Sequence, residues 1–163
     1  MSGGTLNHSI IGNNINAVIN NVLAKNKLNC TAINGDVRIW IESANSFVYP
    51  DAMVICGKIE TAKEDKNAVI NPILTIEILS KSTESYDRGD KFHKYASLSA
   101  FKEYVLIDQK KPVIDILCRE NADHWSMSTK FGLDQSLFLS SINTSISIED
   151  IYKNAQNLGE LPF

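Results

Sequence analysis

One carboxylate lies where the hydrophobic pattern leaves no room for a charge. Glu77 is in the middle of Ile73–Leu79, the most apolar strand-like run of the chain. A buried, ionised carboxylate is very costly unless it has a cation, a metal ion or a raised pKa. Asp51 follows Pro50 at the start of another apolar segment. If the two segments are antiparallel neighbours, both carboxylates lie on one face of a sheet, where two hard oxygen donors would bind Mg²⁺ or Mn²⁺.

Three further polar residues have helical spacing. Asp87, Lys91 and Tyr95 recur at every fourth position, so a helix places them on one stripe. Each of these features also has a structural interpretation. Asp51 after a proline is typical of a turn or cap, and Glu77 could be one half of a structural ion pair. The spacing of Asp87 and Lys91 is equally that of an ordinary exposed helix with an ion pair.

The helices that must position these residues follow from hydrophobic periodicity. An apolar stripe predicts a first helix over Ser9–Lys25, and a second helix is expected over Tyr86–Leu98. A terminal helix is expected over Ser147–Asn157, with Ser147 as its N-cap. The polar segment Lys58–Asn71 is predicted to be the solvated loop of a hairpin.

Strands are expected where apolar residues alternate with polar ones or form short runs. These segments are Asp36–Glu42, Ala52–Cys56, Ile73–Leu79, Tyr104–Asp108, Val113–Cys118 and His124–Met127. The order is one helix, several strands, a second helix, more strands and a last helix. A mixed sheet flanked by helices is the natural packing of such an order.

Length and charge limit the classes of function. The 163 residues are enough for one domain, and no apolar run has the roughly 18 residues that a membrane span needs. The first residues, Met1–Thr5, carry no secretory signal, so we expect a cytoplasmic protein without a membrane partner. With 16 Lys and Arg against 19 Asp and Glu, the net charge is −3, so nucleic acid would have to bind at a local patch or a metal site.

The cysteines give no sign of a zinc site. Cys30, Cys56 and Cys118 are far apart, odd in number and form no CxxC pair. We therefore expect three free, buried or half-buried thiols.

Four motifs in a fixed order make the sequence recognisable. They are Tyr49–Asp51, Pro72–Ser80 with Ser82 and Thr83, Asp87–Lys91 with Tyr95, and Glu103–Asp108. This set resembles the Uma-type family of "putative restriction endonucleases", within the PD-(D/E)XK nuclease superfamily. The resemblance covers nearly the whole chain, from His8 to Ser147–Tyr152. It implies a single domain over residues 1–163 with an α/β (α+β) fold, a restriction-endonuclease-like mixed β-sheet flanked by α-helices.

The resemblance also implies roles for the polar residues. Asp51 matches the Asp of the PD motif and Glu77 matches the acidic residue of the (D/E)XK strand, which makes both of them metal ligands. Leu79 stands where that motif has its lysine. In some branches this lysine has moved to the following helix, where Lys91 matches it, and Lys81 is the rival. Three more residues match recurrent family positions and would support the site: His8, Asp87 and Tyr95.

The chain departs from the pattern in two places. Many PD-(D/E)XK enzymes use an acidic residue of the first helix, but Ser9–Lys25 contains no Asp or Glu. Glu42 could substitute for it, although an outward strand charge is the simpler interpretation. Family members also begin with a further segment ahead of the helix, where this sequence starts with Met1–Gly4.

The resemblance implies an Mg²⁺-dependent (or Mn²⁺-dependent) endonuclease that hydrolyses DNA phosphodiester bonds. A homodimer is expected because two active sites can cut both strands, and Phe131–Leu139 is a candidate interface. The alternative is a catalytically incomplete nuclease-fold module that binds nucleic acid or a protein partner. A third hypothesis is hydrolysis of RNA or another phosphodiester by the same site.

Overall fold

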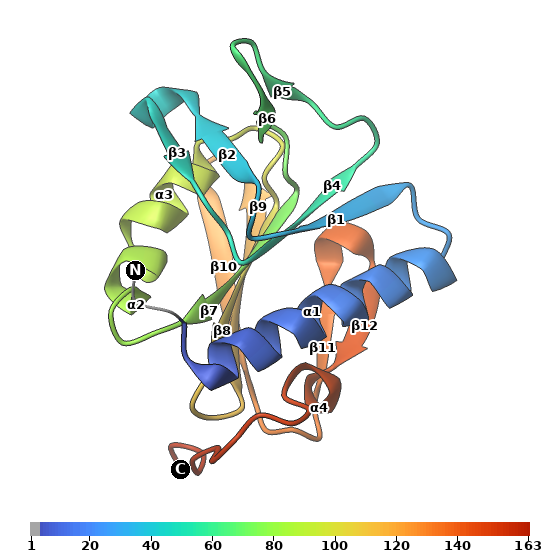
Figure 1. The fold of residues 1–163 in the computed structure, drawn as a ribbon, viewed down its shortest axis with the longest axis vertical. Helices are drawn as coiled ribbons and strands as arrows, with labels where there is room; N and C mark the ends of the chain where they lie inside the picture. Colours follow the sequence, from blue (N-terminus) through green and yellow to red (C-terminus); the bar gives the residue numbers. More distant parts are fainter. Residues whose placement is uncertain (1–3) are drawn as a thin grey trace.

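A six-stranded sheet runs through the centre of the molecule (Figure 1), in a computed structural model that describes residues 4–163. Met1–Gly3 belong to the segment that was predicted to carry no secretory signal, and they lie outside the described residues. In spatial order the strands are β1 (Cys30–Asn34), β4 (Ala52–Cys56), β7 (Leu74–Leu79), β8 (Glu103–Asp108), β9 (Val113–Asn121) and β10 (His124–Phe131). Within this sheet of the described chain, only β7 and β8 pair in parallel, and the other neighbours are antiparallel. The predicted mixed sheet is confirmed, with β7 as a central strand buried at every residue.

The long helix α1 (Leu6–Lys25) covers one face of this sheet. Its apolar stripe is buried against the sheet, as predicted, through Ile11, Ile15, Ile19 and Leu23. The helix begins three residues before the predicted Ser9, because the Thr5 hydroxyl accepts a hydrogen bond from the His8 N–H at 3.1 Å and caps it. His8 therefore lies inside the first turn. Within residues 4–163, no helix combines the length and apolar character that crossing a bilayer demands.

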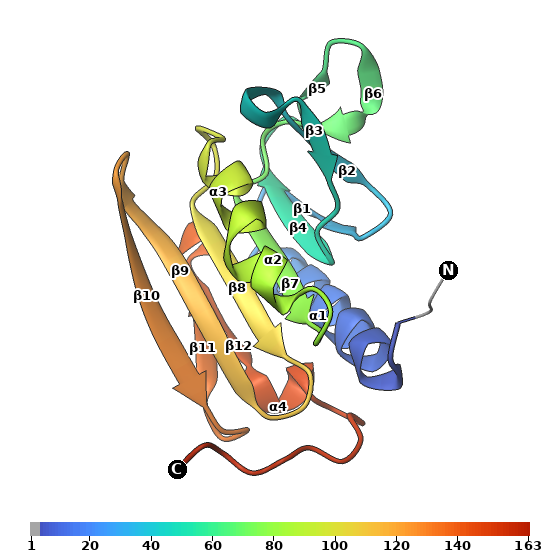
Figure 2. The same ribbon diagram turned by 90° about the vertical axis from the view of Figure 1, so that its left-hand side faces the viewer.

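Two short helices cover part of the opposite face (Figure 2), where a single one was predicted over Tyr86–Leu98. They are α2 (Glu84–Arg88) and α3 (Asp90–Ala96). Gly89 separates them with φ −110° and ψ −100°, a conformation that a residue without a Cβ adopts most easily. The pair forms the crossover between the parallel strands β7 and β8.

A second, four-stranded sheet packs beside α3 on the same face. Its strands, in order, are β3 (Ser46–Val48), β2 (Arg38–Ile41), β6 (Asp65–Val69) and β5 (Thr61–Ala62). Ile39 and Ile41 of β2 are buried, as the alternation predicts. The solvated loop predicted over Lys58–Asn71 is wrong, because this segment contains β5 and β6, and β6 pairs in parallel with β2.

The end of the chain differs most from the prediction. The hairpin of β11 (Ser136–Leu139) and β12 (Thr144–Ser147) closes the core beneath α1. Two 3₁₀ turns, η1 (Glu42–Ala44) and η2 (Ser140–Ile142), complete the connections. Ser147 caps α4 (Ile148–Ile151), as predicted, but the helix has only one turn, and Asn154 has a left-handed φ of 66° that stops its continuation.

The prediction of three free thiols is wrong. Cys30 and Cys56 are direct partners in the β1–β4 ladder and form a disulfide, and only Cys118 is free. Sequence spacing could not show this pairing, because it depends on the register of two strands separated by the whole of β2 and β3.

Candidate active site

The register of β4 and β7 brings the two predicted carboxylates together. Ala52 pairs with Ile76 in an antiparallel ladder, so Asp51, one residue before β4, falls opposite Glu77. The Asp51 N–H donates to the Ile76 carbonyl at 3.1 Å, and the Ile78 N–H donates to Asp51 Oδ2 at 2.7 Å. The backbone of the central strand thus fixes the position of the Asp51 carboxylate.

A cleft of about 430 Å³ opens at this end of the sheet. It lies where the first turn of α1 approaches α2 and the start of β4. Besides Asp51 and Glu77, its lining includes His8, Tyr49, Tyr86, Asp87, Lys91 and Gln109. Of the six residues that the sequence singles out, five therefore line one cleft. The sixth, Tyr95, is outside the lining and donates a hydrogen bond to Glu77.

Glu77 is almost fully buried, at 1% exposure, and both of its oxygens are held. Tyr95 Oη donates to Oε1 at 2.8 Å, and Lys91 Nζ lies 2.9 Å from Oε2. Burial raises the pKa of Glu77 to about 8, and the negative charge of Asp51 adds to the shift while Lys91 opposes it. Burial also raises the pKa of Tyr95, so its phenol stays protonated and donates to Glu77.

Lys91 is a buried cation with three acceptors. Its Nζ lies 2.9 Å from Glu77, 3.5 Å from Asp87 Oδ1 and 2.9 Å from the Tyr49 carbonyl oxygen. Burial alone would lower the pKa of Lys91, but the attraction of Glu77 and Asp87 outweighs it, and the pKa is raised. The alternative of a structural ion pair at Glu77 is thus partly right. The interpretation of Asp87 and Lys91 as an exposed pair is wrong, because both are buried.

The two substitutes considered for missing motif residues lie away from the carboxylates. Lys81, the rival of Lys91, is exposed and lines a separate hollow with Asp108. Glu42 is exposed in η1, beside Trp40 and outside the cleft. The structure therefore brings Lys91, and neither Lys81 nor Glu42, to Glu77.

His8 contacts the other carboxylate. Its Nε2 lies 3.2 Å from Asp51 Oδ1, and this hydrogen bond raises the pKa of His8 although partial burial opposes the shift. Helix α1 contains no acidic residue, as the sequence shows. The ionisable side chain that this helix contributes to the cleft is therefore His8. When it is protonated, His8 adds a second positive charge to the lining of the cleft.

Gln109 is a cleft residue that the sequence reasoning missed. Its Nε2 donates to the Leu79 carbonyl at 2.7 Å, while its Oε1 accepts from the Thr5 hydroxyl. Gln109 therefore joins the capped start of α1 to the end of β7, and so holds His8 over Asp51. The only signal in the sequence is that a polar residue directly follows an apolar strand, just as Asp51 directly precedes one.

The donor atoms fit a hard divalent cation. Among residues 4–163, no three His, Cys, Asp or Glu side chains form a ready-made metal cluster. The main-chain oxygen of Ile78 could serve as a third ligand beside the carboxylates of Asp51 and Glu77. It points to the same edge of β7 as the Ile78 N–H that donates to Asp51. These are oxygen donors, which Mg²⁺ and Mn²⁺ prefer. When all three carboxylates are ionised they outnumber the two cations, Lys91 and His8, so a bound divalent cation would relieve their repulsion.

Comparison with known proteins points to one family. The family model Uma2, described as "Putative restriction endonuclease", matches residues 1–149. The uncharacterized protein slr1290 of Synechocystis sp. is 30% identical over 153 residues, which are 94% of this chain and 78% of that protein. A second uncharacterized Synechocystis protein, sll1609, is 40% identical over 74 residues, 45% of this chain and 42% of that protein.

The fold is shared with a solved structure. A crystal structure of "a putative nuclease belonging to DUF820" from Anabaena variabilis superposes with a TM-score of 0.71. The match covers 93% of this chain and 82% of that one, at 21% identity. At this identity the likeness establishes the common fold.

Proposed function

The chain belongs to the Uma2 family of "putative restriction endonucleases", and we propose that it hydrolyses DNA phosphodiester bonds with the help of Mg²⁺ or Mn²⁺. One observation supports this most: Asp51 and Glu77 stand opposite each other on two paired strands, with a buried lysine 2.9 Å from Glu77. Two carboxylates and a cation in one cleft are the groups that phosphodiester hydrolysis needs. Asp51 and Glu77 would hold the metal ion.

The site residues have separable roles in this proposal. A divalent ion held by Asp51 and Glu77 would polarise the scissile phosphate and help to make a water molecule nucleophilic. Lys91 keeps a compact positive charge beside the place where negative charge develops in the transition state. Tyr95 fixes the orientation of Glu77, and His8 fixes that of Asp51.

The proposal extends to the assembly of the active form. A homodimer would bring two clefts to one DNA substrate. Phe138, 52% exposed on β11, is the most exposed apolar residue of Phe131–Leu139, and Leu133 is exposed as well, whereas Leu137 and Leu139 face the core. Light scattering of the wild type and of a Phe138→Asp variant would show a dimer that the variant loses, and a monomeric wild type would refute the assembly.

A second candidate function rests on the composition of α1. Because that helix contributes no carboxylate, the cleft could lack a metal ligand and serve only to bind nucleic acid or a protein partner. Under this alternative the chain would bind its partner without cutting DNA. Hydrolysis of RNA by the same residues is a further possibility that the same assay separates.

The test is nicking of a supercoiled plasmid in Mg²⁺, Mn²⁺ or EDTA, with a labelled RNA strand in parallel. We expect metal-dependent nicking of DNA that falls at least ~100-fold in Glu77→Gln and in Lys91→Met, as when a transition-state contact is lost. Lys81→Met is the matched control, an exposed lysine that should leave the rate unchanged. Nicking that persists in Glu77→Gln, or that is absent from the wild type in both metals, would refute the proposal. Faster cleavage of RNA would reassign the substrate.

A further inference from the structure

Two exposed aromatic rings border the cleft. Tyr49, between β3 and β4, is 50% exposed, and Tyr86, on α2, is 39% exposed, and both line the cleft that holds Asp51 and Glu77. Lys91 lies between them, with its Nζ 2.9 Å from the Tyr49 carbonyl oxygen and 6.0 Å from the centre of the Tyr86 ring. The ammonium of the candidate active site therefore contacts the Tyr49 backbone on one side and lies over the Tyr86 ring on the other, and both tyrosine side chains are exposed.

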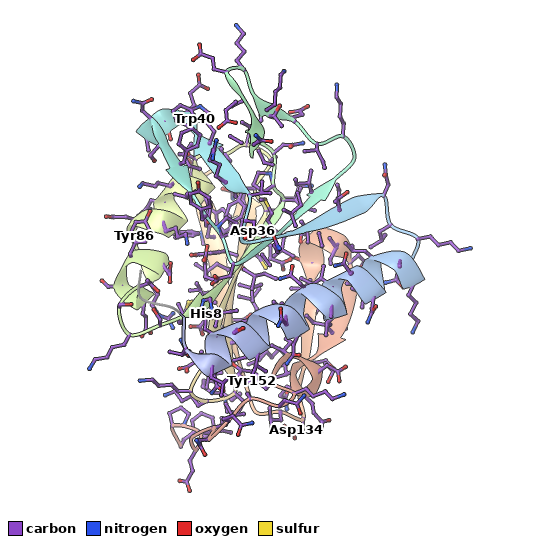
Figure 3. The ribbon with its side chains drawn as sticks, in the orientation of Figure 1. His8, Asp36, Trp40, Tyr86, Asp134 and Tyr152 are labelled. Carbon is purple, nitrogen blue, oxygen red and sulfur yellow. A yellow bond between two sulfur atoms is a disulfide. The ribbon has the colours of Figure 1, made fainter. Side chains whose placement is uncertain are left out.

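The aromatic surface continues from each tyrosine. Phe47, two residues before Tyr49 and on β3, is 46% exposed, and its ring centre lies 4.8 Å from that of Trp40. Arg38, which Asp65 holds at 2.6 Å, places its guanidinium 5.1 Å from the centre of the Phe47 ring. Figure 3 shows Trp40 and Tyr86 on the same side of the molecule, above the first turn of α1 that carries His8.

A cation accompanies Tyr86 as well. Lys94 Nζ lies 5.4 Å from the centre of the Tyr86 ring and donates to Tyr86 Oη at 3.3 Å. Exposed rings gathered at a polar cleft are typical of a binding surface, and here Tyr49 and Tyr86 line the cleft while Phe47 lies two residues before Tyr49. We call Tyr86, Tyr49 and Phe47, with Lys94 and Arg38, the aromatic track.

Charge and size indicate which form of nucleic acid fits this track. A duplex is bound mainly through its phosphates, by many Lys and Arg side chains, but the chain has a net charge of −3. Unpaired bases instead stack on aromatic rings, at about 1–3 kcal/mol per base and with little dependence on sequence. A cleft of about 430 Å³ is also in the size range of sites for one small ligand, of the order of a single nucleotide.

We propose that the aromatic track binds single-stranded DNA by stacking on its unpaired bases, and so places one phosphate at Lys91. This inference rests on the proposed nuclease function of the cleft and adds the substrate's conformation to it. Tyr86 and Tyr49 would hold the bases on either side of the scissile phosphate. Phe47 would hold a base farther along the strand.

Fluorescence anisotropy of a labelled 20-nucleotide strand and of its blunt duplex, both in EDTA, tests this without cleavage. We expect the single strand to bind at least ~10-fold more tightly than the duplex. Tyr86→Leu and Tyr49→Leu should each weaken single-strand binding about 5- to 150-fold, the loss expected when one stacked base loses its ring. Tyr86→Phe keeps the ring and should stay within about 3-fold of the wild type. Phe163→Leu, which removes an exposed ring outside both the cleft lining and Phe131–Leu139, is the control and should change nothing.

The outcomes separate this inference from the proposed function. Duplex binding as tight as single-strand binding, or unchanged binding by both Leu variants, would overturn the aromatic track even if plasmid is cut. Single-strand binding that depends on both rings would support the track even if no metal-dependent cleavage occurs, in which case only the nuclease proposal fails. A matched RNA strand bound more tightly than the DNA strand would overturn the assignment to DNA.

Discussion

The stability of the metal-free chain should depend on the protonation of Glu77. Because burial raises the pKa of Glu77 from 4.5 to about 8, the folded chain keeps a proton where the unfolded chain has released it. This contribution to the free energy of unfolding is fully present below about pH 4.5 and is lost as the pH rises through about 8. At about 1.4 kcal/mol per pH unit, the loss across this window is on the order of 5 kcal/mol.

Glu77→Gln isolates this effect, because the amide keeps the shape of the side chain and removes the titration. We expect the free energy of unfolding of the variant, minus that of the wild type, to rise by up to about 1.4 kcal/mol per pH unit between pH 5 and pH 8. The measurement is urea unfolding in EDTA at each pH unit of this range, followed by tryptophan fluorescence. The raised pKa of His8 affects both proteins alike and cancels in the difference.

Glu64→Gln is the matched control, since Glu64 is exposed in the turn between β5 and β6. Its pH profile should run parallel to that of the wild type. If the Glu77→Gln profile also runs parallel, Glu77 is already ionised at pH 5. The inference that burial keeps a proton on Glu77 in the metal-free chain would then be refuted, because the ion pair with Lys91 would have offset the cost of burying the charge.

Three further predictions concern the scaffold of the site. Cys56→Ser should lower the free energy of unfolding by about 3 kcal/mol in urea titrations without reductant, and should leave it unchanged when reductant is present. If the variant and the wild type are equally stable without reductant, the disulfide does not form. By the same measurement, Ile15→Ala should lower the free energy of unfolding by about 2–5 kcal/mol, whereas the control Asn13→Ala, at an exposed position, should change it little. Equal losses in the two variants would contradict the packing of α1. Buried Glu103 accepts four hydrogen bonds from Ser140 and Ser141. Glu103→Gln should therefore lower the free energy of unfolding by about 1–3 kcal/mol and speed amide hydrogen exchange of both serines. Unchanged exchange would contradict the role of Glu103 in holding η2.

The elements with a strong hydrophobic pattern could be predicted from the sequence. The stripe of α1 and the unbroken apolar runs of β4, β7 and β8 are buried where the pattern places them. The pairing of Asp51 with Glu77 was predictable because side chains alternate between the two faces of a sheet, and antiparallel neighbours place opposing residues on the same face. Lys91 could be chosen over Lys81 only by resemblance, since both lie in polar sequence.

What could not be predicted depends on contacts between distant parts of the chain. The Cys30–Cys56 disulfide follows from a strand register, and β6 forms because its buried Ala68 and Val69 pair with β2 in spite of polar neighbours. The helix break at Gly89 lies inside a continuous polar–apolar pattern that favours one helix. Gln109 acquires its position only when the start of α1 meets the end of β7.

The measurement that tests the central claim most directly is a calorimetric titration of Mn²⁺ into the metal-free chain at pH 7.5. The account predicts one binding site per chain, with binding that is abolished in both Asp51→Asn and Glu77→Gln but kept in the control Glu64→Gln. Each ligand variant removes one of the two carboxylates that the β4–β7 register brings together. No binding by the wild type, or binding that survives in both ligand variants, would contradict a metal site between these two strands.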